Sequence, residues 1–231
     1  MQDKVHYEAK KNMCHFVNSN VNFPAPVSVL GFLAACGGIF LSGVAILVAC
    51  SIHKLKFARL LAALVGVAAI VYFALLFGFS LISQQKILAR GQEKYFCEID
   101  CHLAYSVIDI KTIDIKTAPT GEMLRYTVTL QTRFDETTIS SRRPLDATLT
   151  PNPREIRLLD GQGREYGVSE IGGIPLETPL KPGGSYTTQL QFTLPKDASN
   201  LRLLLTAAGW QQRLLIGEEN SWLHKKTYFA L

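Results

Sequence analysis

Two cysteines and one histidine within six residues form the most reactive group of side chains in this sequence. Cys97 and Cys101 are separated by three residues, and His102 follows directly. A second Cys-His pair, Cys14 and His15, lies near the start of the chain. Thiolate and imidazole groups bind both copper and zinc. These five residues are therefore the candidate ligands of a metal site.

The geometry of a strand decides whether the three neighbouring groups can meet. From residue 95 to 107 the odd positions are apolar or cysteine, which predicts a strand with an apolar inner face. On that strand the Cα atoms of Cys97 and Cys101 lie about 13 Å apart, whereas a disulfide needs about 7 Å or less. The favoured interpretation is two buried thiols beneath an exposed stripe that includes His102. A bulge in the strand would bring the three groups together.

Two long apolar runs precede this segment and predict a transmembrane hairpin. Residues 27–52 carry no charge, and a second helix is expected over about 58–86; each exceeds the roughly 20 residues that cross a bilayer core. A polar tail, residues 1–26, comes first, and a cleaved signal peptide would place its apolar core nearer the start. Small residues recur four apart along the runs and predict close helix packing. They are Gly31/Ala35, Gly38/Ser42, Ala62/Gly66 and Ala74/Gly78.

Basic residues next to the apolar runs predict the orientation. Lys54, Lys56 and Arg59 make the short connecting loop the densest basic cluster beside the membrane, which places that loop in the cytoplasm. Both tails then lie on the periplasmic or extracytoplasmic side of a bacterial cytoplasmic (inner) membrane.

This orientation leaves two further interpretations of the cysteines open. On the same side of the membrane, Cys14 can form a disulfide with Cys97 or Cys101. Alternatively, Cys14 and His15 can join Cys101 and His102 in a copper or zinc site. Three cysteines outside the apolar runs do not make a complete disulfide framework.

From residue 95 to 231 the hydrophobic period changes to two. Residues 124–134 and 186–194 alternate apolar and polar side chains, as half-buried antiparallel strands do. Turn residues at 160–163 predict a hairpin. Seven or eight short strands of this kind predict an all-β, antiparallel, immunoglobulin-like sandwich.

The end of the chain is assigned to the same sandwich. Short strands are expected over residues 213–216 and 226–231. Trp210 and Trp222 are expected in the core, because buried aromatic residues dominate such sandwiches. His224 is expected to face solvent.

Charge and motifs exclude several classes of function. The net charge is +5, but the basic excess lies within the first 94 residues, and a nearly neutral β domain offers little to nucleic acid. The sequence contains no nucleophile elbow, zinc-protease motif, Walker loop or dinucleotide fingerprint. No charged residue lies in the middle of either apolar run, so an ion route has no residue to use.

The C-terminal part is similar to a known family. The similar segments are Ile108-Asp109-Ile110, Tyr126-Thr127-Val128, the turn Leu180-Lys181-Pro182-Gly183 before Tyr186-Thr187-Thr188, and Tyr228-Phe229. Over residues 100–231 this pattern resembles the bacterial immunoglobulin-like (telokin-like) extracytoplasmic domain of unknown function. The resemblance implies the fold and an extracytoplasmic location, and it brings no catalytic residues.

The order of the parts resembles a second family. Two transmembrane helices followed by an external β-sandwich is the layout of cytochrome oxidase subunit II, whose dinuclear copper site uses a Cys-x3-Cys loop. Cys97 and Cys101 have that spacing. In that family the loop lies near the end of the domain and precedes a further His and Met. Here the pair lies at the start, and no methionine follows Met123.

The expected function is a non-enzymatic, membrane-anchored interaction module, an accessory or scaffold subunit of a larger membrane protein complex. Its expected partners are the lipid bilayer and membrane proteins, not nucleic acid, and no cofactor is expected. The alternative is a copper- or zinc-binding, or redox-linked, membrane protein that uses Cys97, Cys101 and His102.

The native cysteines provide a test of the orientation. We expect a membrane-impermeant thiol reagent to label Cys14, Cys97 and Cys101 in intact cells, because both tails are predicted to lie outside. Reduction before labelling increases the signal if Cys14 is cross-linked to either of the others. Labelling that occurs only after the membrane is permeabilised would show the opposite orientation.

Element analysis of the purified protein tests the metal alternative. If Cys97 and Cys101 hold copper or zinc, the wild type contains metal above background and a Cys97→Ser/Cys101→Ser variant loses it. Background levels of both metals in the wild type would end the hypothesis.

Overall fold

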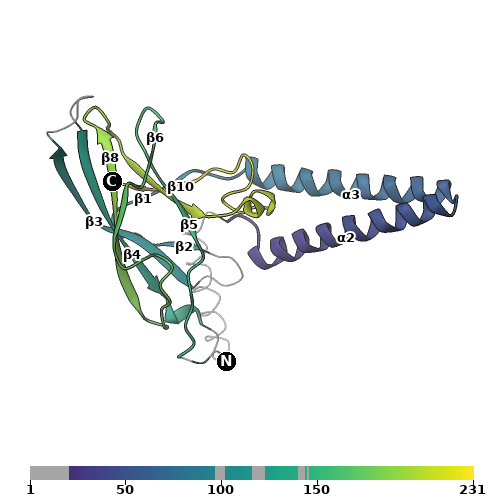
Figure 1. The fold of residues 1–231 in the computed structure, drawn as a ribbon, viewed down its shortest axis with the longest axis horizontal. Coiled ribbons are helices and arrows are strands. Elements are labelled where there is room, and N and C mark those ends of the chain that lie inside the picture. Colours follow the sequence, from purple (N-terminus) through teal and green to yellow (C-terminus); the bar gives the residue numbers. More distant parts are fainter. Residues whose placement is uncertain (1–20, 97–101, 116–122, 140–143, 145) are drawn as a thin grey trace, which may run out of the picture. The chain divides into compact units, whose positions relative to one another are not determined.

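The structure is a computed structural model that describes residues 21–96, 102–115, 123–139, 144 and 146–231. The described chain forms two compact units (Figure 1). One contains residues 21–83 together with 210–225, and the other contains residues 84–209 and 226–231.

The first unit is built on a helical hairpin of α2 (Ala25–Ser51) and α3 (Leu55–Leu81). Proline in the first turn suits the start of α2, and His53 with φ 59° lies in the tight connection. Each helix has 27 residues and is about 40 Å long at 1.5 Å per residue. Both are long and apolar enough to cross a membrane, as predicted. Helix α3 ends at Leu81, earlier than the predicted residue 86, and strand β1 begins at Lys86.

The apolar side chains of this hairpin lie on its outside. Only 6% of the most apolar window of either helix is buried. Phe40, Leu47 and Ile70, for example, are each 70% exposed. A core helix of a soluble domain would bury such residues on its apolar face. The hairpin is therefore the membrane-associated part of the chain.

The second unit is a β-sandwich of two five-stranded sheets. One sheet contains, in spatial order, β1 (Lys86–Leu88), β10 (Thr227–Ala230), β9 (Arg202–Ala207), β5 (Arg154–Leu159) and β6 (Glu165–Gly167). The other contains β2 (Lys94–Phe96), β3 (Leu103–Ile115), β4 (Met123–Phe134), β8 (Ser185–Pro195) and β7 (Glu170–Gly173). Neighbouring strands are antiparallel, apart from the parallel pair β1 and β10.

The described residues thus contain more strands than the seven or eight predicted. Strands β1, β2, β6 and β7 have only three or four residues, too few to show a period of two. The sandwich also begins at Lys86, earlier than the expected residue 95.

The core lies between the sheets and follows the predicted alternation. In β8 every second residue is buried, including Leu190, Phe192 and Leu194. They belong to one apolar cluster with Leu203 and Phe229 of the other sheet. Such alternation is what a sheet with one buried face requires.

Two polar side chains fit this framework in specific ways. Lys94 is 1% exposed, and its ammonium group donates to the carbonyls of Leu205 in β9 and Thr227 in β10, at 2.6 and 3.4 Å. It therefore ties β2 to the opposite sheet. The predicted turn at 160–163 is confirmed, because the Asp160 carboxylate accepts the backbone N–H of Arg164 and β5 pairs with β6.

The last part of the chain differs from the sequence expectation. The strand predicted over 213–216 is wrong, because the short 3-10 helix η2 (Trp210–Leu214) includes its first two residues and residues 210–225 do not belong to the sandwich. Trp210 and Trp222 are 64% and 44% exposed, so their assignment to the core is also wrong. His224 is buried and not solvent-facing. The strand expected within 226–231 is confirmed as β10.

Candidate functional site

The strands β2 and β3 precede and follow the cysteine segment in the sequence. Strands β2 and β3 pair antiparallel, with Phe96 opposite Leu103. The prediction of one continuous strand over 95–107 is therefore wrong, since the chain reverses between these two residues. The separation of about 13 Å expected between Cys97 and Cys101 assumed that strand, and both residues lie outside the described part of the chain.

Four of the five candidate metal ligands, Cys14, His15, Cys97 and Cys101, lie outside the described residues. The disulfide and the copper or zinc site consequently stay predictions. Among the residues that the structure describes, no group of three or more His, Cys, Asp and Glu side chains is placed to hold a metal ion.

His102, the fifth candidate, is buried and not part of an exposed stripe. It is 7% exposed, and its ring stacks on Phe134 with a centroid distance of 5.6 Å. Its Nδ1 lies 2.5 Å from the hydroxyl of Thr138, and that hydroxyl donates to the carbonyl of Asp135. A hydroxyl has one proton to give, so Nδ1 carries the proton of the pair. In the neutral ring, Nε2 is then the nitrogen that can accept a hydrogen bond or bind a metal.

A polar cluster lies beside His102 and consists of Glu93, Tyr95, Arg133 and Asp135. Arg133 donates to both carboxylate oxygens of Glu93, at 2.6 and 2.8 Å. The Tyr95 hydroxyl lies 2.9 Å from Glu93 and 2.8 Å from Asp135. Asp135 also caps the short 3-10 helix η1 (Glu136–Thr138), because its carboxylate accepts the backbone N–H of Thr137.

The polar cluster is held in one protonation state near neutral pH. Burial would raise the pKa of Asp135, but hydrogen bonds from Thr137 and Tyr95, with the charge of Arg133, outweigh it and lower this pKa to about 2. The Arg133 hydrogen bonds lower the pKa of Glu93. Burial and the two carboxylates raise the pKa of Tyr95. Neither carboxylate is poised to exchange a proton near pH 7, so the cluster braces the fold.

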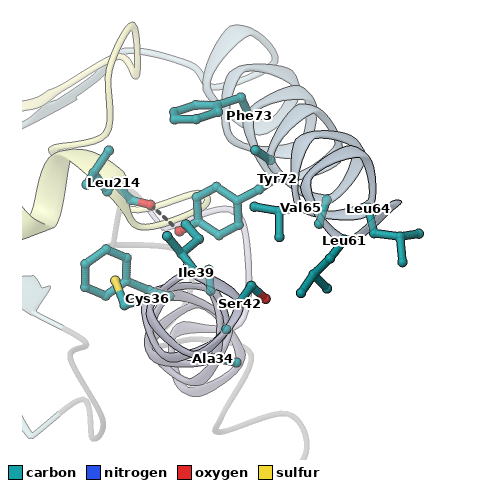
Figure 2. Close-up of a pocket in the computed structure, with 15 residues that line it drawn as sticks. Ala34, Cys36, Ile39, Ser42, Leu61, Leu64, Val65, Tyr72, Phe73 and Leu214 are labelled. Atoms are coloured by element: carbon teal, nitrogen blue, oxygen red, sulfur yellow. Dashed lines mark hydrogen bonds between the residues drawn. The ribbon is translucent and has the colours of Figure 1, made fainter. Parts of the chain in front are cut away.

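A crevice with a volume of about 530 Å³ lies between α2 and α3 (Figure 2). From α2 it is lined mainly by Ala34, Ala35, Gly38, Ile39 and Ser42, and from α3 by Leu61, Leu64, Val65, Ala68 and Ala69. Tyr72 also lines it and donates its hydroxyl to the carbonyl of Leu214, at 2.6 Å. The crevice is therefore apolar, and the polar group of Tyr72 is already bonded.

Small residues line this gap instead of closing it. A Cβ atom added at Gly31, Gly38, Gly66 or Gly78 would meet nothing within 4 Å beyond its own helix. At these four glycines the structure therefore shows no close contact between the two helices. The four-residue spacing of small residues nevertheless indicated which face of α2 lines the crevice. Ala35, Gly38 and Ser42 belong to that spacing pattern and line the crevice.

The fold and the site together define a membrane-associated protein that carries a two-sheet β-sandwich. No family model and no curated protein matches the sequence. The chain is similar to the solved structure of a conserved hypothetical protein from Bacillus anthracis, at 11% identity and a TM-score of 0.34. The likeness covers 51% of this chain and 89% of that one.

The lowered pKa of Asp135 predicts a specific acid sensitivity. Its ordinary value is 3.8 and its value in the fold is about 2. A carboxyl group of this kind stabilises the fold above its ordinary pKa and loses that contribution as pH falls toward the lower value. We expect stability to fall between about pH 4 and pH 2, and Asp135→Asn to show a shallower fall. At neutral pH the variant should be about 1–3 kcal/mol less stable.

Urea unfolding of the detergent-solubilised full chain, followed by circular dichroism, provides the measurement. Asp109→Asn is the control, because that carboxylate is 47% exposed and lies 3.8 Å from the Lys111 ammonium. Its loss should change stability by less than about 0.5 kcal/mol. Identical acid sensitivity in the wild type and Asp135→Asn would contradict the assignment.

Proposed function

We propose that this protein is a non-enzymatic, membrane-anchored interaction module that acts as an accessory or scaffold subunit of a larger membrane protein complex. Its hairpin holds an immunoglobulin-like sandwich on the extracytoplasmic side of a bacterial cytoplasmic membrane. The observation that carries the proposal is the hairpin itself, whose helices leave an apolar crevice between them and nearly all of their side chains uncovered.

Packing in lipid explains why this observation points to a protein partner. Lipid tails are as apolar as leucine, so helices associate there through close packing rather than through the hydrophobic effect. A crevice of about 530 Å³ forfeits dispersion contacts along both of its walls. Small residues such as Ala35, Gly38 and Ala68 let another backbone approach closely. A transmembrane helix of a partner protein recovers those contacts.

Other features support the remaining parts of the proposal. The exposed basic residues Lys54, Lys56 and Arg59 lie at the start of α3, next to the connection between the helices, and favour a cytoplasmic connection and external tails. An antiparallel sandwich agrees with the family resemblance over residues 100–231. The polar cluster beside His102 keeps its charges paired, which suits a rigid display domain.

Photo-crosslinking in native membranes tests this function. A benzophenone amino acid at position 35 faces the crevice, whereas the same group at position 44 does not line it. We expect position 35 to give one discrete adduct with another membrane protein, identified by mass spectrometry. Position 44 should give little of that adduct.

Neighbouring glycines provide a matched pair of variants. Gly38 lines the crevice and Gly37 does not, although both lie at the same depth of α2. Gly38→Leu should reduce the adduct at least about fivefold, because its side chain occupies the space of the partner helix, while Gly37→Leu should retain it. An adduct with lipid alone, or with a second copy of this chain, would contradict the proposed role.

A further inference from the structure

The segment between β9 and β10 belongs to the hairpin and not to the sandwich. We call residues 210–225 the β9–β10 cap (Figure 1). Hydrogen bonds join it to the helices and their flanking residues. The Tyr72 hydroxyl donates to the carbonyl of Leu214, Asn22 N–H donates to the carbonyl of Gly217 at 3.0 Å, and Lys225 N–H donates to the hydroxyl of Ser83 at 2.8 Å.

The fit of the cap against the hairpin is close at Gly217. This residue has φ 68°, a conformation that favours glycine, and an added Cβ atom would clash with Phe23. Trp222 packs nearby on the ring of Phe77, with 15° between the ring planes. The β9–β10 cap therefore packs against the hairpin.

Helix geometry gives the depth of this element. Counted along α3 at 1.5 Å per residue, Tyr72 lies about 24 Å from Lys56 in the first turn of the helix, and Phe77 lies about 32 Å from it. A helix tilt of about 20° lowers these heights by about 2 Å. The hydrocarbon core is about 30 Å thick. When Lys56 marks one membrane surface, the Tyr72 contact with Leu214 falls inside the core and Trp222 falls at the opposite surface.

The side chains of the cap suit that position. Trp210, Trp222 and Leu223 are exposed, at 64%, 44% and 65%. Tryptophan is enriched at membrane interfaces, where its ring meets the acyl region and its N–H meets the headgroups. These residues come from one short segment, and the position of Trp222 on Phe77 places them at the level where such a belt forms.

The backbone of the cap meets the requirement for irregular structure at this depth. Lipid provides no hydrogen bonds, so irregular backbone is tolerated only where its polar groups have partners in the protein. The carbonyl of Leu214 accepts from Tyr72, and the carbonyl of Leu215 accepts from the hydroxyl of Ser221 at 2.5 Å. Within the cap, the backbone N–H of Trp222 donates to the carbonyl of Arg213.

We propose that the β9–β10 cap is a membrane-interface element whose partner is the bilayer surface at the end of the hairpin opposite the basic loop. Trp210, Trp222 and Leu223 lie among the headgroups and upper acyl chains. Two separate segments of the chain then contact the membrane. One is the hairpin, and the other is the cap between β9 and β10. This inference needs the hairpin to span the membrane, and it needs no protein partner.

Intrinsic fluorescence reports on this cap alone, because Trp210 and Trp222 are the two tryptophans of the chain. The full chain is reconstituted in phosphatidylcholine vesicles that contain lipids brominated at shallow or at deep acyl positions. Trp210→Phe and Trp222→Phe variants separate the two signals. We expect shallow bromine to quench both tryptophans about twofold more than deep bromine does, and aqueous iodide to quench them weakly.

A third variant establishes whether the hairpin is inserted. It lacks both native tryptophans and carries Phe40→Trp, a position in α2 that is 70% exposed. Deep bromine should quench this tryptophan. If it does, and iodide rather than shallow bromine quenches Trp210 and Trp222, the cap lies in water and the proposal is wrong. Failure to quench the tryptophan at position 40 would remove the spanning hairpin and overturn the proposal with it.

A pair of glycine variants tests the seating of the cap. Gly217→Ala places a Cβ atom against Phe23, so the cap should lift and iodide quenching of Trp222 should rise about twofold or more. Gly91→Ala is the control, because Gly91 also has a positive φ but nothing lies within 4 Å of an added Cβ atom. Equal iodide quenching in both variants would contradict the seated arrangement.

Discussion

Hydrogen bonding of the backbone in apolar surroundings is the constraint on which both units depend. A helix bonds its own N–H and C=O groups, which lets α2 and α3 leave almost all of their apolar side chains uncovered. In the irregular part of the β9–β10 cap, backbone carbonyls have no helical partner. The hydroxyls of Tyr72 and Ser221 donate to two of these carbonyls, those of Leu214 and Leu215. In the sandwich, the same groups are paired between strands, and the apolar side chains turn inward.

Polar side chains in the sandwich serve its rigidity. Arg133 holds Glu93 with two short bonds, Asp135 closes the start of η1, and Lys94 reaches from β2 to the opposite sheet. Each charge in these contacts has an opposite charge or a carbonyl beside it, as buried charges require. A domain braced in this way presents a fixed surface, which agrees with a role in display and interaction.

Two sequence patterns show how far a local pattern determines the structure. The alternation over 95–107 is a property of the sequence alone: Phe96 of β2 and Tyr105 and Val107 of β3 lie in the core, so the buried positions change from even to odd between the two strands. The small residues of α2 do mark one face of the helix, but their spacing does not predict what that face contacts. In the structure Ala35, Gly38 and Ser42 on that face line a crevice, and residues of α3 form its other wall.

The sequence by itself determined the two long helices and the alternating strands β4 and β8, because those features depend on length, charge and periods of 3.6 or 2 along the chain. Only the tertiary structure decided that His102 is buried, that residues 210–225 leave the sandwich, and that an apolar crevice remains in the hairpin. These features arise from contacts between distant residues. Tyr72 and Leu214 are 142 positions apart, and no local pattern encodes such a pair.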